Sequence, residues 1–412
     1  MYYYFLFVCS FLLGFFKIPY GMVNDIIFIP LIFYILKNWK VFTRLDKPSK
    51  ALLICWSLFT LYYTFLLLTT DKFNSAASVI FNIRGMYPFL FTYLTVIIIN
   101  TKSKLFKFIR FLLLAGVIAT VIAVVQSIYG LEPMFDPKKF YNIGHWAGQG
   151  NKMIGPIARV MLPTLYLVIM LFICAVIYKF FNSKSRNFLH IFIFLIPVLI
   201  SYARGMWLAI VLSIIITLFL LMRKKILNVK ALSSTIIYLV MAGFILSMFI
   251  SKKNDIALSI ADRFTTGISE FVNKNGTYGT RLDESQVFLV KWYTTGFYSG
   301  IDPFYEQRNE ATTLADVGYV YVLVSTGLIG LVLLALIWLS GIWFSLHSMN
   351  LLVKAKLKKY TIFPACFLAV ILFFIVSQLY IQYNFIITVL AIAYGLAIST
   401  KKIFYDQVSI KK

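Results

Sequence analysis

The chain has 412 residues, of which 61% are hydrophobic, 18% aromatic and only 13% charged, and it carries a formal net charge of +24. Too few charged side chains remain to cover the surfaces of soluble domains, so this composition excludes a soluble protein. The four cysteines lie far apart inside apolar runs, and neither they nor the three histidines have the spacing of metal ligands. We therefore predict neither a disulfide framework nor a metal site.

Repeated runs of about 16–22 apolar residues, separated by short basic segments, predict an all-α integral membrane protein with a single polytopic domain over residues 1–412. A cleavable signal peptide is not expected, because Met1-Tyr-Tyr-Tyr lacks a basic start and the first apolar run is followed by more membrane sequence. Twelve helices are predicted, at approximately 2–16, 21–36, 51–69, 81–99, 107–127, 154–177, 188–203, 205–222, 231–250, 316–344, 362–380 and 384–400.

The positive charge is concentrated in alternate connections between these helices. These connections hold 24 of the 39 Lys and Arg residues but only two acids, Asp46 and Asp406. The positive-inside rule makes them cytoplasmic, places both termini inside and accounts for the excess charge without nucleic acid. The connections are 37–50, 102–110, 179–186, 223–230, 354–359 and the tail from Lys401.

The longest polar stretch, Ser251–Ala315, then forms a large extracytoplasmic loop between the ninth and tenth helices. Apolar residues at helical spacing over 256–272 predict an amphipathic helix lying in the outer interface. Thr280-Arg-Leu-Asp283 resembles a capping box, which predicts a second helix from Arg281 to about Tyr293. Gly296, Gly300 and Pro303 are expected to end it.

Three arginines are predicted at the starts of helices that enter the membrane from outside: Arg84, Arg159 and Arg204. A cation there opposes the helix dipole, but together with the free backbone N–H groups it suits a bound anion such as a diphosphate. Gly85 and Gly205 would let such a ligand approach the backbone. The alternative is that each arginine extends to lipid headgroups at the interface.

Two further residues of the outer side have alternative roles. Asp316, at the start of the tenth helix, is either an N-cap or a base that takes a proton from an attacking hydroxyl. His145, in a second outer loop over 128–153, could line a sugar site, although a single loop histidine is often structural.

Three stretches resemble the superfamily of O-antigen ligases and O-antigen polymerases (Wzy-type). Ser201-Tyr-Ala-Arg204-Gly-Met-Trp207-Leu-Ala is similar to a segment between two of the family's helices. Arg281, then Trp292, then Gly296 and Gly300 are similar to its loop pattern. Asp316-Val-Gly-Tyr319, followed by Gly327-Leu-Ile-Gly330, is similar to the entry to the next helix. Ligases commonly have His-Asn at the position of Asp316-Val317, so the resemblance favours a polysaccharide repeat-unit polymerase.

The resemblance implies a GT-C-like architecture and a metal-independent, cofactor-free glycosyltransferase of the cytoplasmic membrane. Its substrate would be an undecaprenyl-diphosphate-linked oligosaccharide, and its partners the membrane lipid and a flippase and chain-length regulator of the same pathway. Arg204 and Arg281 would grip the leaving diphosphate and Asp316 would act as base. The supporting residues would be Arg84, Arg159, Gly205, Trp207, His145, Trp292 and Tyr319.

Two other functions remain open. A ligase would transfer the same donor glycan to a non-polyprenyl acceptor. A transporter or flippase for lipid-linked sugars would also have about twelve helices, but carriers built from two halves usually show internal repeats, and no repeat relates residues 1–200 to 201–412.

Overall fold

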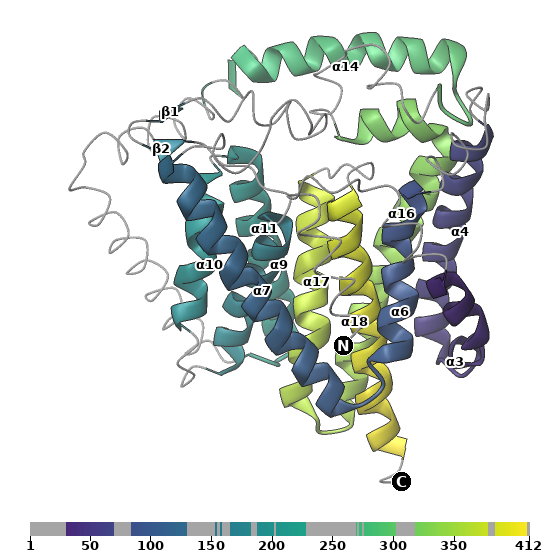
Figure 1. The fold of residues 1–412 in the computed structure, drawn as a ribbon, viewed down its shortest axis with the longest axis vertical. Helices are drawn as coiled ribbons and strands as arrows, with labels where there is room; N and C mark the ends of the chain where they lie inside the picture. The colour runs from purple at the N-terminus through teal and green to yellow at the C-terminus, as the bar shows by residue number, and fades with distance from the viewer. Residues whose placement is uncertain are drawn as a thin grey trace. The chain divides into compact units, whose positions relative to one another are not determined.

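The computed structural model describes residues 30–69, 84–129, 153–154, 157–158, 165–182, 188–201, 203–227, 269, 272–273, 276–301, 318–377 and 384–409. Within these ranges the chain is helical apart from one pair of two-residue β-strands and short connections (Figure 1). It divides into two compact units. Unit 1 comprises 1–18, 106–269 and 356–373, and unit 2 comprises 19–105, 270–355 and 374–412.

The described helices confirm an α-helical membrane protein. Six of them are long and apolar enough to cross a bilayer, for which about 20 residues are needed. Shorter apolar helices cover three more predicted spans, at Tyr87–Ile98, Leu165–Phe181 and Leu189–Ile200. The predicted helices at 2–16, 21–36 and 231–250 lie wholly or mostly outside the described residues. The six long spans are Lys47–Thr69, Lys102–Val125, Gly205–Arg223, Tyr319–Lys354, Lys358–Val376 and Ile386–Phe404.

Unit 2 is built on two helix pairs. Its described elements are α3 (Lys40–Thr43), α4 (Lys47–Thr69), η1 (Arg84–Phe89), α6 (Leu90–Ile98), α14 (Gly276–Thr295), α16 (Gly318–Lys354) and α18 (Asn384–Ser409).

The first pair, α4 and α16, is antiparallel: Tyr62 of α4 lies against Thr326 and Gly330 near one end, and Asp46, just before α4, joins an ion pair beside Phe344 at the other. The second pair, α6 and α18, is parallel, because Thr92 bonds to the carbonyl of Ala391 and Ser399 to that of Thr95.

Gly395 makes the close approach of α6 and α18 possible. A Cβ atom at Gly395 would lie 2.8 Å from the carbonyl oxygen of Thr92 and would also strike the Thr95 side chain. Small residues and hydroxyl side chains at such an interface let backbones approach and supply hydrogen bonds where water is absent. Tyr394 adds a third link from α18, since its hydroxyl donates to the carbonyl of Ile337 on α16 at 3.0 Å.

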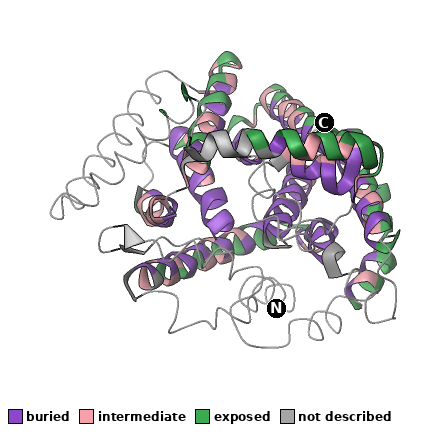
Figure 2. Ribbon diagram, turned by 90° about the horizontal axis from the view of Figure 1, so that it is seen from above, coloured by how far each residue is buried: buried purple, intermediate pink, exposed green. Residues whose placement is uncertain are grey.

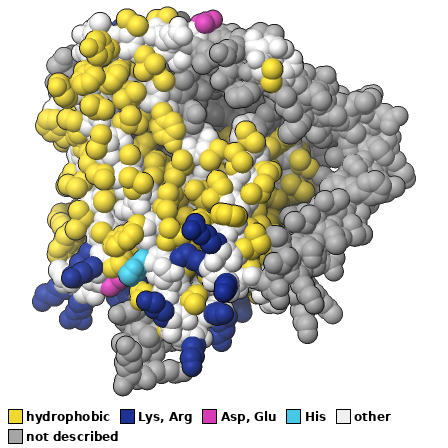
Figure 3. Space-filling view, turned by 180° about the vertical axis from the view of Figure 1, so that it is seen from behind, with side chains coloured by type: hydrophobic (Ala, Val, Ile, Leu, Met, Phe, Trp, Pro, Cys, Tyr) yellow, Lys and Arg dark blue, Asp and Glu magenta, His cyan; other side chains and the backbone are white. Residues whose placement is uncertain are grey.

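One end of unit 2, which we call the basic end, gathers charged residues from three separate segments. The Lys401 ammonium lies 2.5 Å from a carboxylate oxygen of Asp46 and 4.9 Å from the ring centre of Phe344. Lys102 lies over the ring of Phe404 at 5.5 Å. Figure 3 shows Lys and Arg side chains bordering a broad apolar surface. These contacts unite segments 37–50, 102–110 and the tail from Lys401, three of the connections predicted to share one side of the membrane.

Unit 1 contains most of α7 (Lys102–Tyr129), with β1 (Met153–Ile154), β2 (Ile157–Ala158), α9 (Leu165–Phe181), α10 (Phe188–Ile200), α11 (Arg204–Arg223), η3 (Lys358–Thr361) and most of α17 (Ile362–Val376). Gly116 of α7 lies against Phe194 of α10 and Leu171 of α9. Cys366 of α17 points at the backbone carbonyl of Cys174 on α9, with Sγ 3.8 Å from that oxygen. Both cysteines are free, and they pack side by side although the sequence separates them widely.

Two predictions about local structure are wrong. The sixth helix does not begin at 154, because Met153–Ile154 forms β1, which pairs antiparallel with β2. In the sequence, Pro156 lacks the backbone donor that a helix interior needs. Thr280 is not an N-cap: α14 begins at Gly276, so Thr280 and Arg281 lie inside the helix and Asp283 is exposed. A capping box requires the threonine to precede the first helical turn, so this spacing was coincidental.

Candidate functional site

Arg204 is the first residue of α11, as predicted. The preceding residue, Ala203, occupies the N-cap position and has no side chain that could accept a hydrogen bond from the first turn. Gly205 is exposed, and a Cβ atom placed on it would meet nothing within 4 Å. The start of α11 therefore combines a cationic residue, an uncapped first turn and open space beside the backbone, which together suit an anion.

Trp207 holds the turn between α10 and α11. Its indole N–H donates to the carbonyl of Val198 at 2.7 Å, and the hydroxyl of Ser201 donates to the same oxygen at 2.7 Å. Trp207 thus ties α11 to the end of α10, and Ser201 bonds back to the last turn of α10. Trp207 positions Arg204 by fixing the helix that Arg204 begins.

Arg84 also begins a described helix, but of a tighter kind than predicted. Residues Arg84–Phe89 form the 3₁₀ helix η1, which leads directly into α6 and contains Pro88. Phe89, at the junction, is buried and accepts a hydrogen bond from the indole of Trp56 through its carbonyl at 3.2 Å. The backbone that bears Arg84 is therefore anchored to α4.

Arg281 lies on α14, which crosses the top of Figure 1 next to the first turns of α16. Seen from above in Figure 2, much of this helix is exposed, including Val287, Val290 and Tyr293. Its opposite face is partly buried: Phe288 and Trp292 pack against Tyr321 and Val324 of α16. The large loop is thus attached to unit 2 through one face of α14.

The turn that follows α14, residues 296–301, is where the loop meets α16. Trp292 donates its indole N–H to the carbonyl of Phe297 at 3.1 Å and stacks on the Phe297 ring, with the ring centres 4.9 Å apart. Gly300 has φ +82°, a conformation that favours glycine. Gly296 and Gly300 end the helix, as predicted, and shape this turn.

α16 is interrupted at the same place. Gly327 has φ +68° and ψ −171° inside an otherwise continuous helix of 37 residues. In an uninterrupted helix the Leu328 N–H would bond to the Val324 carbonyl. Instead the Leu328 N–H donates to Phe297 at 3.0 Å, and Val324 accepts from the Ile301 N–H at 2.7 Å. The turn therefore supplies partners for backbone groups that the kink releases.

Tyr319 is tied to the protein through its hydroxyl, which donates to the carbonyl of Ile375 at 2.8 Å. All three aromatic residues predicted to bind substrate and described in the structure, Trp207, Trp292 and Tyr319, therefore use their polar atoms within the chain. Contact with a glycan would have to come from their ring faces. Arg159, Asp316 and His145 lie outside the described residues.

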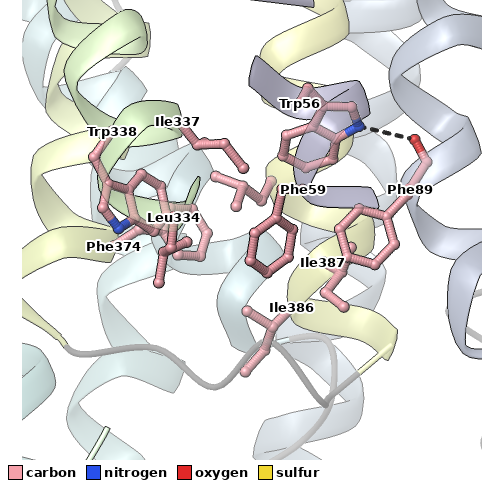
Figure 4. A pocket seen from close by; sticks show the side chains of 10 residues that line it. Trp56, Phe59, Phe89, Leu334, Ile337, Trp338, Phe374, Ile386 and Ile387 are labelled. Carbon is pink, nitrogen blue, oxygen red and sulfur yellow. Dashed lines mark hydrogen bonds between the residues drawn. The ribbon is translucent and has the colours of Figure 1, made fainter. Parts of the chain in front are cut away.

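A cavity lies inside unit 2, between the two ends of α4 (Figure 4). Its volume of about 20 Å³ is enough for one water molecule but not for a hydrocarbon chain. Trp338 reaches into it, and its indole N–H has no hydrogen-bond partner among the described residues. The other lining residues offer no free polar group, so the cavity is a packing defect rather than a substrate site. They are Trp56, Phe59, Phe89, Leu334, Ile337, Phe374, Ile386, Ile387 and Leu390.

In the part of the chain that the structure describes, no three His, Cys, Asp or Glu residues are grouped so that they could hold a metal ion. A comparison with models of known protein families finds no match to this chain, and a comparison with curated proteins finds none either.

The sequence did not predict that the 296–301 turn would bond to α16 at the Gly327 kink, or that Tyr62 would bond to α16 beside it. The Tyr62 hydroxyl donates to the carbonyl of Thr326 at 2.7 Å, across 264 residues of sequence. The glycines themselves were visible as Gly-x-x-x-Gly and Gly-x-x-Gly patterns. The sequence contains no signal that pairs the two patterns with each other.

Proposed function

We propose that this protein polymerises lipid-linked oligosaccharide repeat units into a surface polysaccharide, such as O-antigen, capsule or exopolysaccharide. The chain would cross the cytoplasmic membrane twelve times, with both termini inside and residues 251–315 on the outer face. The basic end of unit 2 supports this topology, because three segments predicted to be cytoplasmic meet there. α14 lies toward the opposite end of α4 and α16, where the outer leaflet would be.

The separation of the two ends is also consistent with a membrane span. A helical rise of 1.5 Å per residue gives about 23 Å from Lys47 to Tyr62 on α4, and about 26 Å from Gly327 to Phe344 on α16. This is close to the hydrocarbon thickness of about 30 Å. The turn after α14 and the Asp46–Lys401 ion pair would therefore sit near the two membrane surfaces.

In the proposed reaction a hydroxyl oxygen of the acceptor repeat unit attacks the anomeric carbon of the donor glycan. The bond between that carbon and the diphosphate oxygen breaks, and the diphosphate leaves with the bonding electrons. Asp316 takes the proton of the attacking hydroxyl. Arg204 and Arg281 stabilise the negative charge that develops on the diphosphate, with Arg84 and Arg159 supporting them. The glycosyl diphosphate supplies the free energy, so neither nucleotide nor metal is required.

The start of α11 carries the proposal. A cation at a helix N-terminus opposes the dipole and weakens the helix unless an anion binds there. At Arg204 the first turn has no capping side chain and the backbone at Gly205 is open. These features are costly in a protein that only spans a membrane and useful in one that binds a diphosphate.

The test uses purified protein in vesicles with undecaprenyl-diphosphate-linked repeat units as the only substrate. A polymerase produces a ladder of chain lengths, whereas a ligase without its acceptor produces nothing. We expect Arg204→Ala and Arg281→Ala each to reduce polymer formation by about 100–1000-fold, the range for loss of one charge-stabilising group.

Matched controls lie on the same helices. Arg223→Ala removes the arginine at the other end of α11, and Lys291→Ala removes an exposed cation from α14. Both controls should retain activity. A ladder of normal length and yield from Arg204→Ala and Arg281→Ala, at normal protein levels, would refute the assignment. Absence of any ladder from the native protein would refute the polymerase itself.

A further inference from the structure

The turn after α14 and the kink in α16 meet through main-chain atoms. Three N–H groups bridge them: Ile301 donates to Val324 at 2.7 Å, Leu328 to Phe297 at 3.0 Å and Ile329 to Tyr298 at 3.2 Å. We call this joint, residues 296–301 with 324–329, the turn–kink contact. Unsatisfied backbone groups are costly where water is excluded, so these bonds hold the loop against α16.

Glycines are required on both sides of the turn–kink contact. A Cβ atom on Gly300 would lie 2.7 Å from backbone atoms of Ser325 and Thr326. A Cβ atom on Gly327 would strike the carbonyl of Tyr298 and the nitrogen of Gly300. Neither clash can be relieved by rotating a side chain, because the obstructing atoms belong to the backbone. Both glycines also have positive φ.

Side chains brace the contact from two directions. From α14, Trp292 bonds to Phe297 and packs with Phe288 on Tyr321 and Val324. From α4, the Tyr62 hydroxyl bonds to the carbonyl of Thr326, and its ring comes within 3.3 Å of where a Gly330 Cβ would lie. The turn is therefore fixed to α16, and α16 is fixed at that point to α4.

We infer that the turn–kink contact sets the position of α14, and that Gly300 and Gly327 are positioning residues for the group-transfer site. The second part rests on the proposed function, because α14 carries Arg281. The geometry is that of a rigid joint rather than a hinge, because α14 ends at Thr295 and the chain is already bonded to α16 at Phe297, two residues later. A shift in the contact would displace the whole helix and the residue it presents to the diphosphate.

The first experiment measures the position of α14 without any assay of activity. Spin labels are placed at two exposed positions of unit 2, Val290→Cys on α14 and Leu61→Cys on α4, in full-length protein whose native cysteines are replaced by alanine. Pulsed electron resonance gives the distribution of distances between them. We expect one narrow distribution in the parent and a broad or shifted one in Gly300→Ala and Gly327→Ala. Thr294→Ala, beside the contact but exposed, should leave it narrow.

The second experiment measures the kinetics of the same glycine variants without spin labels. A misplaced α14 should reduce kcat by about 100-fold, the effect of a shift of about 1 Å at a catalytic group, and change KM for the repeat unit little. Tyr62→Phe keeps every backbone atom of the contact, so it covers the case in which a glycine variant fails to fold. It should give a smaller change of the same kind in both measurements.

The outcomes separate the two proposals. Unchanged distance distributions in Gly300→Ala, Gly327→Ala and Tyr62→Phe would overturn the inference. Altered distances with unchanged kcat would overturn the positioning role of the glycines. If the variants show altered distances and the native protein forms no polymer, the role of the turn–kink contact is supported and only the proposed function is refuted.

Discussion

The two ends of unit 2 join the same helices by opposite means. Toward the start of α16, main-chain hydrogen bonds and glycines hold the loop, and the described residues of the turn–kink contact carry no charge. Toward its end, the Asp46–Lys401 ion pair lies on the ring of Phe344. Main-chain contacts fix a geometry closely and tolerate no added atoms, whereas charged side chains can adjust their rotamers. The difference suits an end where the position of α14 must be fixed and an end where helices need only be held together.

The largest expected effect is at the turn–kink contact. Gly327→Ala forces a Cβ atom into the Tyr298 carbonyl at positive φ, and we expect a loss of about 4 kcal/mol in the free energy of unfolding. The measurement is unfolding of the purified protein by sodium dodecyl sulfate in mixed micelles. Ser340→Ala, further along α16, serves as the control. A loss below about 1 kcal/mol would mean that the kink can straighten at little cost.

The ion pair at the basic end should give the next largest effect. Lys401 is almost fully buried and Asp46 about a quarter exposed, with side-chain exposures of 6% and 29%. Asp46→Ala leaves a buried ammonium without its partner and should cost about 3 kcal/mol. Lys401→Met leaves only the Asp46 carboxylate, which is partly exposed to water, so it should reduce the free energy of unfolding by less.

A charge exchange sharpens this prediction. The double variant Asp46→Lys, Lys401→Asp should recover part of the stability that each single exchange loses, in the same unfolding assay. Additive losses would show that the two side chains contribute independently.

The apolar region between the two ends provides a smaller and more selective test. Trp56→Phe removes the bond to the Phe89 carbonyl and should cost about 1.5 kcal/mol. Trp338→Phe removes an indole N–H that has no partner among the described residues. Removing this buried, unsatisfied donor should stabilise the protein about as much as the smaller ring destabilises it, so the free energy of unfolding should change little. Thermal unfolding of the two variants side by side checks the order, and an equal loss in both would contradict it.

Tyr62 should contribute less to the free energy of unfolding than Trp56. Tyr62→Phe keeps the ring against Gly330 and loses only the bond to the Thr326 carbonyl, for a cost of about 1 kcal/mol. Measured in the Gly327→Ala background, the same change should cost less, because both residues act on one joint. A fully additive double variant would show that Tyr62 and the kink are independent.

Much of the fold could be predicted because membrane helices are recognisable from the length and composition of apolar runs. The boundaries of α11 and the C-terminal ends of α10 and α14 follow from apolar runs, glycines and short polar turns. The kink at Gly327 could not be predicted, since a glycine in an apolar run is usually compatible with a straight membrane helix. Its conformation depends on bonds to residues 297–301, which only the folded chain brings near.

The candidate site was predictable to a smaller extent. The location of Arg204 at a helix start follows from Ser201-Tyr-Ala-Arg204-Gly, where a short polar turn separates two apolar runs. The role of Trp207 does not, because its bond to Val198 depends on how α10 and α11 fold back on each other. The wrong N-cap prediction at Thr280 has the same origin. A capping pattern is local, whereas α14, which begins earlier at Gly276, is stabilised by the packing of Phe288 and Trp292 on α16.

Because the turn–kink contact is made by main-chain atoms, it specifies little of the loop's sequence beyond Gly296, Gly300 and Trp292. At exposed positions of α14, such as Val287, Val290 and Tyr293, substitutions can accumulate without loosening the joint. α14 can therefore vary at its exposed positions while its register on α16 stays constant. Sequence variation concentrated in the loop, with these three residues unchanged, is the pattern that such an attachment would leave in evolution.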